Sequence, residues 1–119
     1  MQTYEFRVKE ISCGSAKEKI EISRSGAWLV LEGVVNIPDP CHSIKFFSEM
    51  DRDNRVLRVS IKASKIKVFC IQCLAKARFV LRFNTFYLKQ NLMASRFRLI
   101  VNYYVRGRSA VLYNGEIEI

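Results

Sequence analysis

The sequence predicts an all-β protein, an antiparallel β-sandwich of immunoglobulin-like type with seven or eight strands. Apolar and polar residues alternate with a period of two along most of the chain, as in strands with one buried face. Turn-forming residues separate these runs at short intervals, and no long helical period supports a helix-connected parallel sheet. The 119 residues, 50% of them hydrophobic, indicate one domain over residues 1–119 with enough apolar material for a core.

The first half of the chain contains four predicted strands. The longest apolar run, residues 27–35, predicts a buried strand that carries Trp28 into the core. It is followed by the turn Pro38-Asp39-Pro40. The predicted strands of this half are residues 4–8, 20–22, 27–35 and 44–49, and a turn at 51–54 ends the last of them.

The second half continues the alternating pattern, with one exception. Residues 85–95 are apolar at both helical and strand spacing, so we expect a short helix or irregular crossover, with a bulged strand as the alternative. Asn84 or Thr85 would cap such a helix. The adjacent Tyr103 and Tyr104 predict one outward-facing ring. The alternating runs of this half are residues 56–62, 65–70, 75–83, 97–105 and 110–119.

Several classes of protein are disfavoured by what the sequence lacks. No apolar run approaches the ~18 residues that a membrane-spanning helix needs. The first ten residues show no hydrophobic region of a secretory signal, and this leaves the compartment open. Because the five glycines are scattered and Asp51 and Asp53 fit a turn, we expect neither an enzyme nor a bound cofactor.

The positive charge is concentrated in one part of the sequence. The net charge is +9, yet residues 54–115 contain thirteen basic side chains and no Asp or Glu. Many of these lie on the strand faces opposite the predicted core, where they would attract an anionic partner. Acidic residues of the first half and the tail, such as Glu5, Glu18 and Glu118, could instead pair with them across strands. The candidate anion-binding residues are Arg58, Lys62, Lys65, Lys67, Lys76, Arg78, Arg82, Arg96 and Arg98.

Four cysteines allow three interpretations. Cys41 could form a disulfide with Cys70 or Cys73 and tie the Pro-rich turn to a distant strand junction. Cys41, His42, Cys70 and Cys73 could bind zinc, although adjacent residues of an extended chain point to opposite sides. All four cysteines, Cys13 included, could instead be reduced and mostly buried. Redox catalysis is disfavoured, because the C-x-x-C has strand-like flanks and does not open a helix.

The segment from Gly33 to His42, together with the later C-x-x-C, carries a family resemblance. Its pattern Gly-x-x-x-x-Pro-x-Pro-Cys-His followed by Cys-x-x-Cys resembles that of small archaeal single-domain β proteins, many of exported or lipoprotein type. The resemblance implies a cross-link or a shared site between Cys41 and the C-x-x-C. The chain departs from that pattern by its basic charge and its lack of a visible signal. The matching residues are Gly33, Pro38, Pro40, Cys41, His42, Cys70 and Cys73.

These observations predict a non-catalytic binding or interaction domain whose partner is a protein or an anionic polymer. Its contact surface would be the loops near residues 38–42 and the C-x-x-C, or a basic sheet face. The alternative is a basic module that binds nucleic acid and releases it as salt rises. The sequence leaves the oligomeric state open.

Overall fold

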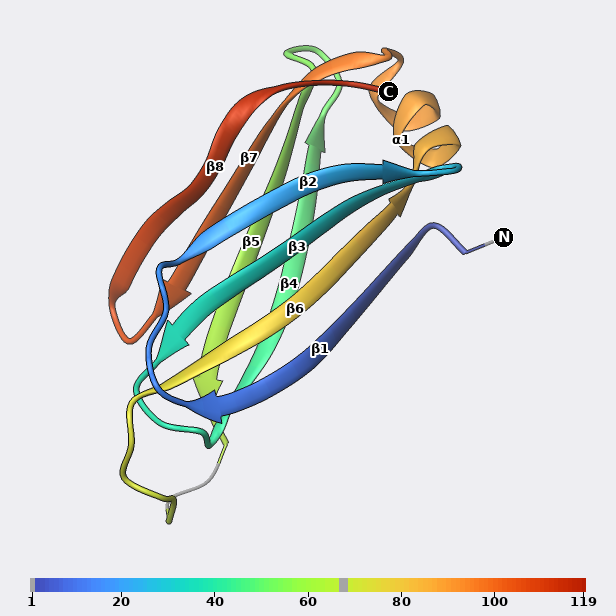
Figure 1. Cartoon of the computed structure of the whole chain (residues 1–119). Helices are drawn as coiled ribbons and strands as arrows, with labels where there is room; N and C mark the ends of the chain where they lie inside the picture. Colours follow the sequence, from blue (N-terminus) through green and yellow to red (C-terminus); the bar gives the residue numbers. More distant parts are fainter. Residues whose placement is uncertain (1, 67–68) are drawn as a thin grey trace.

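The computed structural model describes residues 2–66 and 69–119, which form two four-stranded sheets and one helix (Figure 1). One sheet has the order β1-β6-β3-β2 and the other the order β4-β5-β7-β8. The elements are β1 (Tyr4–Cys13), β2 (Lys19–Ser25), β3 (Trp28–Ile37), β4 (His42–Asp51), β5 (Val56–Lys65), β6 (Ala75–Asn84), α1 (Thr85–Leu92), β7 (Arg96–Val105) and β8 (Arg108–Glu118). The prediction of an all-β sandwich with seven or eight strands is therefore confirmed.

One strand pair departs from the predicted antiparallel pattern. β5 and β7 pair in parallel, whereas the other neighbouring strands are antiparallel. The chain leaves the second sheet after β5, crosses to β6 in the first sheet, and returns through α1 to β7. An immunoglobulin-like arrangement remains a prediction.

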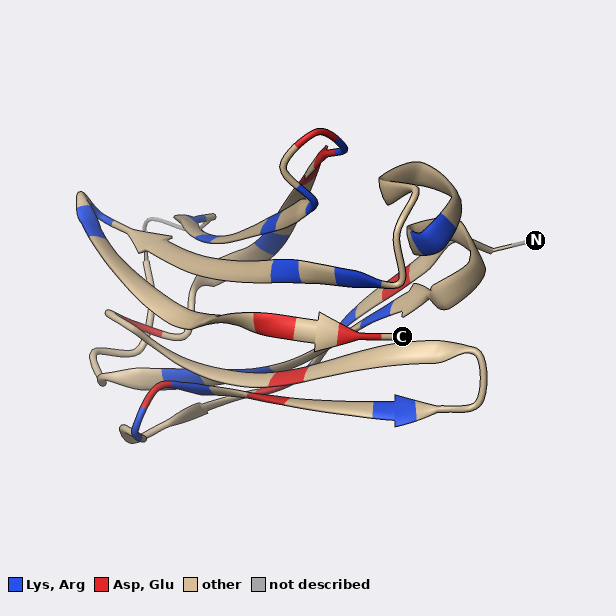
Figure 2. Ribbon diagram, turned by 90° about the horizontal axis from the view of Figure 1, so that it is seen from above, with Lys and Arg blue, Asp and Glu red and all other residues tan. Residues whose placement is uncertain are grey.

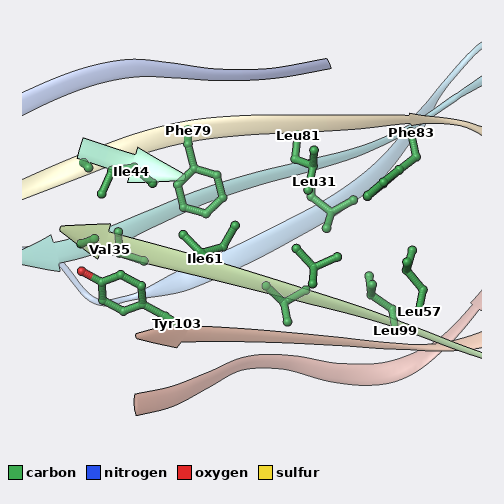
Figure 3. Packing of buried hydrophobic residues seen from close by; sticks show 14 of the residues in the cluster. Leu31, Val35, Ile44, Leu57, Ile61, Phe79, Leu81, Phe83, Leu99 and Tyr103 are labelled. Atoms are coloured by element: carbon green, nitrogen blue, oxygen red, sulfur yellow. The ribbon is translucent and has the colours of Figure 1, made fainter. Parts of the chain in front are cut away.

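The core lies between the inner faces of the two sheets and follows the two-residue period (Figure 3). Leu31, Phe79 and Leu81 point from the first sheet toward Ile61 and Leu99 of the second, and all five are fully buried. Alternation thus placed the correct side chains inside, because successive residues of a strand face opposite sides of a sheet.

Helix α1 closes the end of the sandwich where both termini lie. The Asn84 side chain accepts hydrogen bonds from the backbone amides of Phe86 and Tyr87, as an N-cap does. Leu88 and Leu92, four residues apart, are buried on the inner side of the helix. The predicted short helix, with Asn84 as its cap, is confirmed.

Two details of the predicted strands are wrong. Trp28 is half-buried and lies on the outer face of β3, where the guanidinium carbon of Arg82 sits 4.6 Å from the centre of its ring. The predicted strand at 65–70 is also wrong, because β5 ends at Lys65 and the described residues beyond it, Ile66, Phe69 and Cys70, lie in a loop. Residues 67 and 68 of that prediction lie outside the described part of the chain.

Candidate functional site

Two nested disulfides join the loops at the end of the sandwich opposite α1 (Figure 1). Cys41 bonds Cys70, which confirms the predicted link between the Pro-rich turn and the C-x-x-C. Cys13, at the end of β1, bonds Cys73. The second bridge was missed; the even number of cysteines and the position of Cys13 at a strand end were its only signals in the sequence. Together the bridges hold the β5–β6 loop against its neighbours.

The two other interpretations of the cysteines disagree with this structure. All four sulfurs are in disulfides, so no thiolate is free to bind zinc. One oxygen of Asp39 lies within 4.8 Å of the sulfurs of Cys41 and Cys70, but those two sulfurs are bonded to each other. The reduced, buried state is excluded for the same reason.

His42 and Asp39 form a small buried cluster beside the Cys41–Cys70 bridge. His42 is 2% exposed, and its Nδ1 lies 3.1 Å from both the backbone carbonyl oxygen and Oδ1 of Asp39. Because both neighbours are acceptors, Nδ1 carries the hydrogen. Asp39 also accepts a hydrogen bond from the Cys41 amide and forms an ion pair with Lys65. The cluster holds the turn before β4 in place.

Lys65 also affects the titration of Asp39. The Lys65 ammonium, which donates a hydrogen bond to the Asp39 carboxylate, holds the pKa of that carboxyl below its usual value, and the Cys41 amide adds to this effect. Asp39 is therefore ionised at neutral pH.

We expect Asp39→Asn to lower the melting temperature at neutral pH. This destabilisation should become smaller as the pH falls into the acid range. A carboxyl whose pKa is lower in the folded state contributes stability above its unfolded pKa of about 3.9. That contribution disappears as the pH falls through the folded pKa, when Asp39 of the parent becomes protonated. Melting temperatures of parent and variant across this acid range should converge. The exposed Asp53→Asn is the matched control, and a difference that stays constant in acid would contradict the role of Asp39.

A second acid at this end is also engaged. Glu18 accepts two hydrogen bonds from Arg108, at 3.1 and 3.0 Å, and one from the Asn36 amide at 2.9 Å. Burial raises the pKa of Glu18, but the hydrogen bonds from Arg108 and Asn36 outweigh it, so the pKa lies below its usual value. Tyr103 donates a hydrogen bond of 2.7 Å to the Asn36 carbonyl. The β1–β2 loop, β3 and the β7–β8 hairpin are thereby joined.

Four apolar side chains project from the cross-linked loop into solvent, and we call them the apolar tip. Ile66 is 59% exposed, Phe69 92%, Ile71 72% and Leu74 69%. The loop is anchored at both ends, since the Ile66 amide bonds the Cys41 carbonyl at 2.9 Å and the Leu74 carbonyl accepts from the Gly14 amide at 2.8 Å. Large apolar groups gathered in this way mark interaction sites on folded proteins.

A shallow apolar hollow adjoins the tip. Leu74 borders it together with Pro38 and Val105, and Arg106 and Arg108 of the β7–β8 hairpin form its edge. The sequence did not indicate this arrangement, because the alternating pattern of residues 65–70 suggested a strand with a buried face. The tip and the hollow are neighbours because four loops meet at this end of the sandwich.

The predicted anion-binding residues do not form one surface. Lys76, Arg78 and Arg82 lie on β6 in the first sheet, whereas Arg58, Lys62, Arg96 and Arg98 lie on β5 and β7 in the second. Lys65 is paired with Asp39, and Lys67 lies outside the described residues. Figure 2 shows the basic and acidic positions distributed over both sheets.

Most of these cations have acidic or polar neighbours. Ion pairs join Arg82 to Glu5 at 3.4 Å, Arg96 to Glu118 at 3.5 Å and Arg78 to Glu10 at 4.0 Å. Arg98 donates a hydrogen bond to Asn114, and Arg58 lies opposite Glu49. The acidic residues of the first half and the tail therefore balance much of the basic set across strands, as the sequence allowed.

One part of the second sheet lacks this balance. Lys45 of β4 lies directly opposite Lys62 of β5, and Tyr104 of β7 lies next in the same row. The exposed ring of Phe47 has the Lys62 ammonium 5.3 Å from its centre. We call these four residues the lysine–aromatic patch. Two like charges opposite each other destabilise a sheet, so the patch is suited to an anion.

Comparison with known proteins yields no relative of this chain: no family model, no curated protein and no solved structure matches it. In the part of the chain that the structure describes, no helix has the length and apolar character needed to cross a membrane. The fold and the site define the class as an all-β sandwich with disulfide-linked loops at one end.

Proposed function

We propose that the protein is a non-catalytic binding domain that contacts its partner through the apolar tip and the adjoining hollow. The observation that carries this proposal is the exposure of four large apolar side chains on a loop fixed by two disulfides. Leaving them in water is unfavourable unless a partner covers them, and the bridges reduce the entropy lost when a partner does so.

The titratable groups at the same end support a binding role. Asp39, His42 and Glu18 each hold a loop through the contacts described above. His42 is almost fully buried, so its ring is out of reach of a substrate in solution.

Two expectations from the sequence, the resemblance to small archaeal β-domains and an immunoglobulin-like sandwich, favour a contact surface at this end of the molecule. Of the residues that carry the resemblance to small archaeal β-domains, Pro38 lines the hollow and Cys41, Cys70 and Cys73 are in the bridges that hold the loop of the tip. Immunoglobulin-like sandwiches commonly bind through loops clustered at one end. Both expectations support a contact surface built from loops.

The test is site-specific photocross-linking in an extract of the source cells that retains the membranes. We expect p-benzoylphenylalanine at position 69 to give discrete adducts. The same group at position 86, which is also exposed but lies on α1 at the other end, should give few. Equal adducts from both positions, or adducts from position 86 alone, would contradict a contact surface at the tip.

A second candidate function, the binding of single-stranded nucleic acid, is favoured by the lysine–aromatic patch. Among the residues that the structure describes, Lys45 and Lys62 have no ion pair, so both can contact phosphates. Exposed rings such as Phe47 and Tyr104 can stack on bases.

For this candidate we expect weak binding of an oligothymidylate at low salt, lost as the salt concentration rises. Replacing Lys45 and Lys62 with Glu should abolish it, because both phosphate contacts reverse sign. Fluorescence anisotropy of a labelled oligonucleotide is the measurement. The matched control reverses Arg78 and Arg82, which lie on the other sheet beside Glu10 and Glu5. Affinity unchanged by the lysine substitutions would remove the patch from consideration.

A further inference from the structure

We propose that the partner of the apolar tip is the surface of an anionic lipid bilayer, into which Ile66, Phe69, Ile71 and Leu74 insert. This inference rests on the proposed function and names the chemistry of its partner. The shape of the tip, the composition of its loop and the charges around it carry the argument.

The tip is a projection at one end of an elongated molecule. The principal extents are 46 × 26 × 22 Å, and the β5–β6 loop lies at the end opposite α1 (Figure 1). A protein partner would need a groove shaped to this projection. A bilayer requires no such groove, because the boundary between headgroups and acyl chains accepts apolar side chains to a depth of roughly 5–10 Å.

The composition of the loop suits this boundary. Between Ile66 and Leu74 its sequence contains one charged residue, Lys67, and from Phe69 to Leu74 the one polar side chain besides the bridged cysteines is Gln72. Its backbone is partly satisfied within the protein, since the Cys73 amide bonds the Ile71 carbonyl at 3.1 Å and the Leu74 carbonyl accepts from Gly14. The backbone groups of the loop without such partners would stay at the hydrated headgroup level, where water can still bond them.

The charges around the tip favour an anionic surface. Lys17, Lys76 and Arg106 lie on loops or strand ends at this end, and no ion pair involving them is found among the described residues. The two acids of this end are neutralised, Asp39 by Lys65 and Glu18 by Arg108. Long basic side chains beside an inserted apolar group can reach the lipid headgroups while their stems remain in apolar surroundings.

The disulfides make insertion less costly. A flexible apolar loop would lose conformational freedom on entering the bilayer, whereas the Cys41–Cys70 and Cys13–Cys73 bridges already restrict this loop in water. The same bridges keep the apolar side chains from folding back into a core, since Cys70 and Cys73 are each tied to a neighbouring strand end.

The experiment is co-sedimentation of the purified, oxidised protein with vesicles of equimolar phosphatidylcholine and phosphatidylglycerol. Vesicles of phosphatidylcholine alone are the lipid control. We expect binding to the anionic vesicles, weaker binding to the neutral ones, and a fall of at least ~10-fold in partition coefficient when Phe69, Ile71 and Leu74 are replaced with Ser. The matched variant replaces the exposed Phe86 and Met93 at the other end and should bind within about twofold of the parent.

A second measurement reports insertion directly. Phe69→Trp should add a fluorescence component that shifts to the blue with anionic vesicles and is quenched by brominated acyl chains. Because all the replaced side chains are exposed, the variants should keep the melting temperature of the parent, so lost binding cannot be attributed to unfolding.

The outcomes separate the two proposals. Absence of vesicle binding by the parent, or binding unchanged by the triple substitution, would overturn the lipid inference. If the parent does not bind vesicles, while position 69 and not position 86 cross-links to one protein that mass spectrometry identifies and that binds the purified parent, a protein partner covers the tip and the proposed function stands. If position 69 gives no discrete adduct to lipid or protein, the proposed function fails as well.

Discussion

Replacing Cys41 and Cys70 with Ser is expected to lower the free energy of unfolding by about 3.5 kcal/mol, the chain-entropy value for a loop of this size. The bridge spans 29 residues and restricts the unfolded chain. It also holds the turn at Pro38–Pro40 against the β5–β6 loop, so its loss should loosen the tip. Urea unfolding of the oxidised proteins measures the change, and the midpoint should fall without a large change in slope.

The second bridge supplies the comparison. Cys13–Cys73 spans 60 residues and encloses the first bridge, so replacing both of its cysteines should destabilise the protein to a similar or somewhat larger extent, about 4 kcal/mol. Full reduction of the parent should be at least as costly as either double substitution. If reduction leaves the urea midpoint unchanged, the bridges do not stabilise the fold.

Phe79→Ala is expected to cost about 3–5 kcal/mol of folding free energy, because it removes a large ring from the centre of the core. Phe79 is 1% exposed, lies on β6, and packs against the Phe6 ring with centroids 5.9 Å apart. On its other side is Gly33 of β3, where an added Cβ would lie 2.4 Å from Cζ of Phe79. The ring fills space that the glycine leaves open.

Because Gly33 and Phe79 approach so closely, we expect the effects of substitutions at the two positions to be coupled. Gly33→Ala alone should destabilise the protein by about 1–3 kcal/mol through overpacking. In the Phe79→Ala background the same change should cost much less, because the ring is gone and only the flexible end of Ile20, 2.7 Å from the added Cβ, still has to shift. Urea unfolding of the four proteins in this double-mutant cycle gives the coupling energy. Additive effects would show that Gly33 and Phe79 do not share this space.

The local pattern of the sequence was sufficient for much of the fold. Alternation identified the buried faces of β5, β6 and β7, since the two-residue period is a property of any extended strand. The helix after Asn84 and the turn at 51–54 were also recognisable, because caps and turns are made by neighbouring residues. A disulfide between Cys41 and the C-x-x-C was one of the three interpretations of the cysteines that the sequence left open.

The candidate site was harder to predict. The sequence placed it near residues 38–42 and the C-x-x-C, yet it treated Ile66 as part of a buried strand face. Whether an apolar residue is covered depends on which strand passes over it, and that neighbour is distant in sequence. Ile66 and Phe69 are exposed because β5 ends at Lys65 and the disulfides hold the following loop away from the core.

The sequence by itself determined that this protein is an all-β sandwich, which side chains of most strands face inward, and that its basic half has acidic partners available. Only the tertiary structure decided that β5 pairs with β7 in parallel, that Cys13 joins Cys73, that Trp28 lies outside beneath Arg82, and that an apolar tip stands exposed at one end. The physical reason is that periodicity records which face of a strand avoids water. Strand neighbours, bridges between loops and the coverage of a loop depend on contacts between residues far apart in the chain.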